Sequence, residues 1–250
     1  MTRAAWWRLT ALAMIVGLLE VLCHVGTIDR LTMQPPHRIA IDLARLLWSG
    51  DLNGAIAKTL GNAFVAFVLS VVAGVITGVV LHRLRFVRET LEPLFAAYYA
   101  IPIFAFYPLL IVLFGLGDMP QILIGFMLAV VAVIVNTLNG LDRVPRVLLK
   151  TARVSRLSPV ETALLVTLPS ALPYILTGVK FAVAYSLIGI IGAEFIMSRG
   201  GMGYEISFAY NNFDNATMYP LIVLILVVSI SVNMLLVRWE RRVMARRGHR

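Results

Sequence analysis

Long uninterrupted apolar runs, separated by short polar segments, dominate the pattern along this chain. A helix needs about 20 apolar residues to cross the roughly 30 Å hydrocarbon layer of a bilayer. Strands of a membrane barrel would alternate apolar and polar residues, whereas these runs are continuous. We therefore predict an all-α integral membrane protein. Its six expected transmembrane helices are Leu9–Val25, Leu60–Leu81, Leu94–Leu116, Met119–Leu138, Leu172–Met197 and Met218–Trp239.

Two of the polar segments carry apolar residues at helical spacing. After Pro35-Pro36, the residues Ile39, Leu43, Leu46 and Leu47 predict an amphipathic helix that lies on the outer membrane surface. The segment between the fourth and fifth runs is basic and marked by prolines, and it too has helical apolar spacing. It is too basic to sit in lipid. We interpret it as a cytoplasmic docking loop with a short surface helix.

Composition and charge support a membrane protein and exclude a nucleic-acid partner. Hydrophobic residues make up 60% of the chain and charged residues 14%, against about 45–50% and 25% in soluble domains. The net charge of +9 comes mostly from basic residues in alternate loops and in the C-terminal tail. Positive residues favour cytoplasmic loops, and an even number of spans puts both termini in the cytoplasm.

The chain shows no constellation typical of an enzyme. A single cysteine, Cys23, excludes an internal disulfide and a cysteine-based metal cluster. The four histidines are expected to lie on different faces, with no H-E-x-x-H motif, so we expect no metal site. No G-x-x-x-x-G-K-[ST] motif is present, so we expect no ATP binding by this chain. The first apolar run follows basic residues but lacks a small-x-small cleavage site, so we expect it to be retained.

Three charged residues fall inside the apolar runs. We expect Lys180 to extend to the lipid headgroups, and Glu194 to face an outer vestibule or to pair with Arg199. Glu20 is expected to make a local packing contact. The three charges are scattered, so they do not predict a proton relay.

The third apolar run is rich in aromatic residues and is interrupted by Pro102 and Pro108. Prolines free backbone carbonyls that neighbours or water must satisfy. A kinked helix of this kind suits either a pathway wall or ordinary packing. Glycines at positions 74 and 78 in the second run predict a close helix-packing face.

An ordered set of short motifs over residues 55–240 resembles one known family. The motifs are Thr59-Leu60, Gly74, Gly78, Glu92-Pro93, Ile101-Pro102, Tyr107-Pro108-Leu109, Phe114-Gly115-Leu116-Gly117, Asn136-Thr137, Gly140, Ala152-Arg153, Leu168-Pro169, Ala171-Leu172-Pro173, Gly178, Ala193-Glu194, Gly201-Met202-Gly203 and Glu240-Arg241-Arg242. Their order is similar to that in permease subunits of bacterial binding-protein-dependent ABC importers, in the branch for nitrate, taurine and aliphatic sulfonates. The resemblance implies a type I ABC importer permease-like bundle.

The family's cytoplasmic loop has the signature E-A-A, then a glycine, an apolar residue and L-P. Aligned on Leu168-Pro169, Lys150-Thr151-Ala152 stand on E-A-A and Arg156 stands on the glycine. Family members seat this loop, as a coupling helix, in a groove of the ATPase. Arg156 in place of glycine implies either that the partner ATPase has a compensating acidic groove or that docking of the loop is weakened. By resemblance, the coupling residues are Ala152, Arg153, Arg156, Leu157, Ser158 and Pro159, and the candidate pathway residues are Tyr98, Tyr107, Tyr185 and Glu194.

The resemblance also implies partners. These are two copies of an ABC ATPase that binds ATP and Mg, a second identical or homologous permease, and a periplasmic or lipid-anchored binding protein. The expected location is the bacterial inner membrane, and the expected substrate is a small sulfonate, nitrate or similar anion, or a small heterocycle. An ion-gradient-driven carrier or channel is the alternative, but the sequence shows no convincing internal repeat.

We accordingly divide the chain into four regions. A first transmembrane helix takes residues 1–27, and an outer loop with its interfacial helix takes residues 28–58. A core permease domain takes residues 59–240 and contains the coupling loop 139–170. A basic cytoplasmic tail takes residues 241–250.

Overall fold

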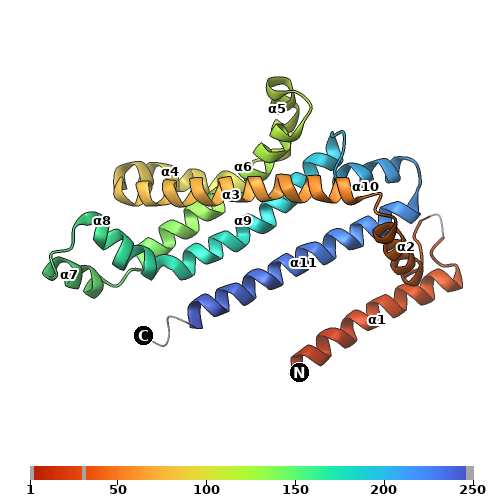
Figure 1. Ribbon diagram of the computed structural model, residues 1–250, viewed down its shortest axis with the longest axis horizontal. Helices are drawn as coiled ribbons and strands as arrows, with labels where there is room; N and C mark the ends of the chain where they lie inside the picture. Colours follow the sequence, from red (N-terminus) through yellow and green to blue (C-terminus); the bar gives the residue numbers. More distant parts are fainter. Residues whose placement is uncertain (1–2, 30–31, 246–250) are drawn as a thin grey trace.

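The computed structural model describes residues 3–29 and 32–245, and within them the chain is helical with no strand. Figure 1 shows long helices running along the molecule, with shorter helices at both ends. The principal elements are α1 (Arg3–Val25), α2 (Pro36–Ser49), α3 (Asn53–Arg83), α4 (Arg85–Ala97), η1 (Tyr98–Ala100), η2 (Ile103–Phe106), α5 (Tyr107–Phe114), α6 (Asp118–Asp142), α7 (Arg146–Val154), α8 (Pro159–Thr162), η3 (Ala163–Thr167), α9 (Leu168–Ile196), α10 (Met202–Asn211) and α11 (Asn215–Ala245).

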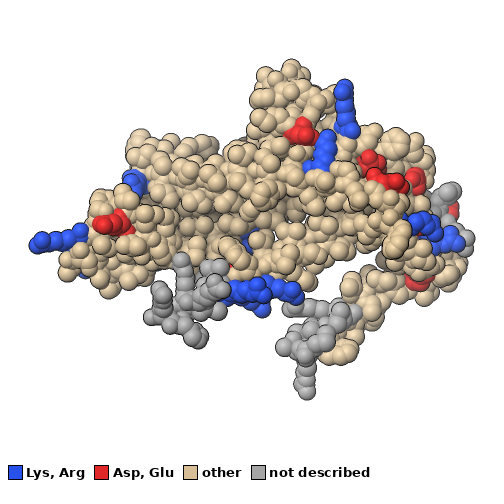
Figure 2. Space-filling model, viewed as in Figure 1, with Lys and Arg blue, Asp and Glu red and all other residues tan. Residues whose placement is uncertain are grey.

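Four helical segments of the described chain are long and apolar enough to cross a membrane. They are α3, α6, α11 and the continuous segment Pro159–Ile196, which runs from α8 through α9. In Figure 2 the middle of α3 is free of Lys, Arg, Asp and Glu, and charged residues lie toward its two ends. The predicted second, fourth, fifth and sixth runs correspond to these segments.

The predicted third transmembrane helix, Leu94–Leu116, is not one helix. The chain bends by 88° between Arg85–Ala100 and Ile103–Phe114, and with this bent pair the number of candidate spans rises to five. Ile101 is extended, with φ −76° and ψ 124°, because the ring of Pro102 disfavours the helical conformation of the residue before it. The prediction of a single kinked helix was therefore wrong.

The first predicted run forms α1, but its apolar part, Thr10–Val25, is shorter than a full span. The predicted count of six full-length spans is therefore not confirmed. Figure 1 shows α1 standing apart from the bundle, and its main packing partner is α2. The N-terminal end of α1 and the C-terminal end of α11 point toward the end of the molecule that carries α7 and α8. The placement of both termini in the cytoplasm stays a prediction.

The centre of the fold is a layer of α3, α6 and α9, which make the most extensive contacts in the molecule. Gly74 and Gly78 bring α3 against α6, as predicted. A Cβ atom added at Gly74 would lie 2.5 Å from Val133 Cβ, and one added at Gly78 would lie 2.7 Å from Thr137 Cβ. Only glycine therefore permits this helix spacing.

The predicted amphipathic helix after Pro35-Pro36 is present as α2, where Pro36 is the first helical residue. Proline suits that position because its missing N–H has no partner within the helix. Ile39 is buried, while Trp48 remains 94% exposed. Apolar residues of α2 pack on the cluster formed by α10 and α11. Its placement on the membrane surface stays a prediction.

Candidate functional site

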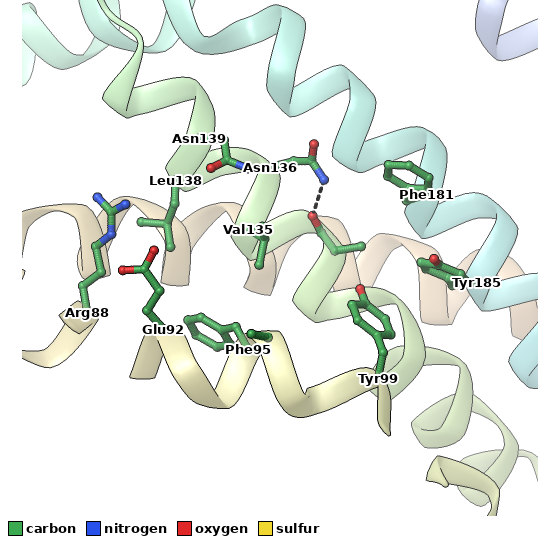
Figure 3. Close-up of a pocket in the computed structure, with 12 residues that line it drawn as sticks. Arg88, Glu92, Phe95, Tyr99, Val135, Asn136, Leu138, Asn139, Phe181 and Tyr185 are labelled. Carbon is green, nitrogen blue, oxygen red and sulfur yellow. Dashed lines mark hydrogen bonds between the residues drawn. The ribbon is translucent and has the colours of Figure 1, made fainter. Parts of the chain in front are cut away.

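A cavity of about 440 Å³, the central cavity, opens between α4, α6 and α9. Figure 3 shows side chains from all three helices converging on it. Aromatic rings lie toward one end and charged residues toward the other. The lining residues are Arg88, Glu92, Phe95, Ala96, Tyr99, Ala132, Val135, Asn136, Leu138, Asn139, Phe181 and Tyr185.

Aromatic rings form a continuous strip along one wall of this cavity. The rings of Tyr99 and Tyr185 have centroids 5.9 Å apart, and Phe181 lies 6.0 Å from Tyr185 at an angle of 15°. Phe181 and Tyr185 are four residues apart on α9, so both project from one face of the helix. Tyr99 lies in η1, just before the break at Ile101 and Pro102. The break thus ends α4 next to the aromatic rings of α9.

The opposite end of the cavity is polar. Asn136 donates its side-chain N–H to the Ala132 carbonyl at 2.8 Å, the dashed line in Figure 3. Arg88 donates two hydrogen bonds to the Asp142 carboxylate, at 2.7 and 2.6 Å. This paired geometry is the strong form of an arginine–carboxylate contact. The positive charge on this wall is therefore already matched by a carboxylate at the end of α6.

The end of the bundle opposite the docking loop holds a buried polar cluster centred on Glu194, which we call the outer polar cluster after its predicted side of the membrane. Its carboxylate is fully buried and accepts hydrogen bonds from the Thr59 hydroxyl at 2.7 Å and the Gly203 amide at 3.0 Å. The Met202 amide donates to the same Thr59 hydroxyl at 2.8 Å. Glu194 thus lies at the N-terminus of α10, where backbone N–H groups favour negative charge. It neither faces an open vestibule nor pairs with Arg199, so that prediction was wrong.

The four predicted pathway residues occupy different places. Tyr185 lines the central cavity. Tyr98 lies edge-on to Tyr99, and its hydroxyl donates to the Met127 carbonyl at 2.8 Å. Tyr107 is buried and donates to the Met197 carbonyl at 2.6 Å, and Glu194 belongs to the outer polar cluster. Their role in transport stays a prediction.

Lys180 does not extend to the headgroups as predicted. Its ammonium forms an ion pair with Glu240 on α11, and both side chains are more than two-thirds buried. This pair joins the middle of α9 to the C-terminal part of α11. It lies away from the lining of the central cavity.

The predicted docking loop folds as α7, a short turn and α8. Arg156 adopts a positive φ of 52° at the end of α7. The Arg156 amide donates to the Arg153 carbonyl, and the Leu157 amide donates to the Ala152 carbonyl, both at 3.0 Å. This pattern is a Schellman motif, whose left-handed position usually holds glycine. The structure therefore explains why Arg156 aligns with a glycine of the family signature.

Ser158 ends the turn and begins α8. Its hydroxyl accepts from the Glu161 amide at 3.2 Å, while the Glu161 carboxylate accepts from the Ser158 amide at 2.7 Å. These two bonds form a capping box that fixes the start of the helix. A π-helical turn, Ala163–Thr167, then joins α8 to α9.

The outer face of the docking loop combines apolar and basic side chains. Ala152 is buried against the body of the protein, while Val147 and Val154 are 71% and 85% exposed. Exposed basic residues surround these valines. They are Arg146, Lys150, Arg153 and Arg156. This face fits a partner surface that presents an apolar patch surrounded by acidic residues.

Sequence reasoning missed most of the cavity lining. Arg88 and Asp142 are 54 residues apart, so no local pattern joins them. Asn136 and Asn139 were the available signal, because amide side chains three residues apart in an apolar run are costly without a purpose. Tyr99 follows Tyr98 directly, and nothing in the local sequence indicates which of the two rings lines the cavity.

Residues 44–245 match the family described as the inner membrane component of binding-protein-dependent transport systems. The chain belongs to this family. It is thus the membrane component of such a transport system, and the resemblance inferred from its motifs is confirmed. The match takes in α3 to α11, and with them the central cavity, the outer polar cluster and the docking loop.

Individual relatives agree with this assignment. The chain is 29% identical over 180 residues to the nitrate import permease protein NrtB of Leptolyngbya laminosa, covering 72% of this chain and 64% of that protein. It is 28% identical over 194 residues to the putative aliphatic sulfonates transport permease protein SsuC of Bacillus subtilis, covering 78% and 70%.

A solved structure shows the same fold. A chain of the MetNI methionine ABC transporter, in an inward-facing conformation, superposes with a TM-score of 0.68. The match covers 80% of this chain and 98% of that one at 20% identity. The predicted importer permease-like bundle is therefore confirmed as a fold.

Proposed function

We propose that this permease component forms half of a pathway that carries a small solute across the bacterial inner membrane, by alternating access driven by a separate ATPase. The observation that carries the proposal is the connection between the central cavity and the docking loop. Arg88 lines the cavity from α4 and is bound to Asp142, four residues before α7 begins. Movement of the docking loop therefore acts on the cavity wall through this ion pair.

A second contact ties the base of the docking loop to α9. The Arg143 guanidinium donates to the Tyr174 hydroxyl at 3.0 Å and lies 5.1 Å from the centre of its ring. The base of the loop is thus tied to α9, a helix that also lines the cavity. A surface helix linked in this way can move its bundle as a rigid body.

The partners follow from the family and from the exposed face of the docking loop. We propose two copies of an ABC ATPase, which bind ATP and Mg, with this loop seated on one of them. Ala152, Arg153, Arg156, Leu157, Ser158 and Pro159 are the proposed coupling residues. A second permease, identical or homologous, completes the pathway, and a periplasmic or lipid-anchored binding protein delivers the solute.

The cavity suits a small polar solute. It offers two amide side chains, four aromatic rings and the Glu92 carboxylate, while its arginine is held by Asp142. Relatives are named for nitrate, aliphatic sulfonates and riboflavin. We propose a small anion, such as a sulfonate or nitrate, or a small heterocycle, which the rings bind by stacking.

The proposal is tested by gentle solubilisation of native membranes that contain a C-terminally tagged protein, followed by identification of co-purifying chains. We expect a P-loop ATPase that is lost when residues 152–159 are scrambled. Scrambling residues 36–49, which form α2, is the matched control and should leave the ATPase bound. A chain that purifies alone, and carries solute in liposomes under an ion gradient, would contradict the proposal in favour of a secondary carrier.

A further inference from the structure

Two of the four histidines lie together with a carboxylate where α1 meets α2. Glu20 Oε1 lies 2.5 Å from His37 Nδ1 and 3.1 Å from His24 Nε2. The ligand atoms of all three residues lie within 4.8 Å of one another. The expectation that the histidines lie on different faces was wrong for this pair, because His24 and His37 stand thirteen positions apart in the chain and meet where α1 packs against α2.

The spacing of the two rings fits coordination to one ion, and their stacked orientation would have to change when the ion binds. The His24 and His37 imidazoles are within 3° of parallel, with centroids 5.8 Å apart. Zinc–nitrogen distances of about 2.0–2.1 Å place two imidazoles bound to one ion with their centroids about 5–6 Å apart. Rotation of the His24 and His37 side chains would turn both ring planes toward one ion and open the short contacts with Glu20 to the spacing of ligands around a tetrahedral ion.

A backbone hydrogen bond orients the Glu20 carboxylate for metal binding. Glu20 Oε2 accepts a hydrogen bond from the His37 backbone amide at 3.2 Å, at the start of α2. Oε1 is thereby left facing both imidazoles. Hydrogen-bonded ligands of this kind are oriented before the ion arrives. In the described part of the chain, the ion-pair partners of Glu20 are these two histidines.

The cluster is also accessible. The side chains of His24 and His37 are 62% and 47% exposed, and that of Glu20 is 27% exposed. A site with two histidines, one glutamate and an open fourth position is a recurrent zinc arrangement. Imidazole ligands favour zinc, copper and nickel over magnesium and calcium. Because α2 is the main packing partner of α1, an ion at this point would fasten α1 to the rest of the protein.

We propose that Glu20, His24 and His37 bind one divalent transition-metal ion of the zinc class, with a water molecule as the fourth ligand. The site lies apart from the central cavity and the docking loop. Its presence or absence therefore does not bear on the proposed transport function.

The test uses the full chain, purified in detergent through an affinity peptide that contains no histidine and stripped with a chelator. Equilibrium dialysis with Zn²⁺ should give one ion per chain. Substituting His37→Ala or Glu20→Gln should weaken binding about tenfold or more, with an unchanged size-exclusion profile. Zn²⁺ should also raise the half-aggregation temperature of the unsubstituted protein but not of these variants.

Matched controls decide between this site and adventitious binding. His82→Ala removes a histidine paired with Asp142 at 3.5 Å, and Cys23→Ser removes the buried thiol of the residue that precedes His24 in the chain. Both variants should keep full Zn²⁺ affinity. Equal binding by the unsubstituted protein and the His24→Ala/His37→Ala double variant would overturn the proposal, as would loss of binding in either control alone. In that case the three side chains are joined by hydrogen bonds only.

Discussion

Replacing Glu194 with alanine removes a buried carboxylate that joins α3, α9 and the start of α10. Two donors lose their acceptor: the Thr59 hydroxyl and the Gly203 amide. A buried donor without a partner costs about 1–3 kcal/mol, so the two together cost about 2–6 kcal/mol of the free energy of unfolding. At about 2–4 °C per kcal/mol for a chain of this size, even the lower value lowers the melting temperature by about 4–8 °C.

The isosteric variant Glu194→Gln separates the hydrogen bonds from the rest of the side chain. Its amide oxygen can still accept from the Gly203 amide, and its amide nitrogen can donate to the Thr59 hydroxyl, which retains a free lone pair. We therefore expect a loss of only about 1 kcal/mol, close to the net value of an ordinary hydrogen bond.

The assay is the half-aggregation temperature of the purified full chain in detergent, read by size exclusion. Glu89→Ala serves as the control, because this side chain is 61% exposed and pairs with Arg85 on the same helix turn. Such a pair contributes about 0.3–0.5 kcal/mol. If Glu194→Ala melted together with this control, or if glutamine were as damaging as alanine, the hydrogen-bond reasoning would be refuted.

Three further perturbations test other parts of the structure. Arg156→Gly should raise the half-aggregation temperature by up to a few degrees, because the left-handed conformation costs a side-chain-bearing residue about 1–2 kcal/mol and glycine gives back only about 0.5–1 kcal/mol in chain entropy. A fall in this temperature would show that Arg156 is not strained in this turn. Gly78→Leu should abolish accumulation of folded protein, since its Cβ would lie 2.7 Å from Thr137 Cβ, whereas Gly61→Ala, with nothing within 4 Å, should be tolerated. Arg88→Asp and Asp142→Arg should each reduce ATP-driven uptake in the reconstituted complex, and the double exchange should restore part of it; no recovery would argue against coupling through this pair.

Local patterns predicted much of the fold. The continuous apolar runs gave four of the spanning segments, and the spacing of Ile39, Leu43 and Leu46 gave α2. Gly74 and Gly78 indicated the close face between α3 and α6. In each case a repeating distance along one helix determines which side chains share a face, so the sequence alone carries the information.

The prolines show the limit of predicting helix breaks from local sequence. Pro93, Pro173 and Pro220 lie inside helices that continue past them, whereas Pro102 accompanies an 88° bend. The restriction that a proline ring places on the preceding residue is common to all four positions, yet the helix breaks only at Pro102. The residue type alone therefore does not predict which proline ends a helix.

Ion pairs between residues far apart in the chain could not be predicted from local sequence either. Arg88 with Asp142, and Lys180 with Glu240, join different helices. Their meeting depends on helix packing and on the direction of each turn. Charge and composition can indicate that such residues need partners, but they do not say which ones.

The π-helical turn Ala163–Thr167 sets the rotational register between the docking loop and α9. A π turn holds one residue more than an α turn, and each residue of an α-helix advances by about 100° around its axis. The extra residue thus rotates everything before it by about a quarter of a circle relative to α9. A docking loop of given length can in this way present different side chains to its partner, depending on whether this turn is wound as π or as α. Rewinding this one turn would reorient the loop without stretching the chain.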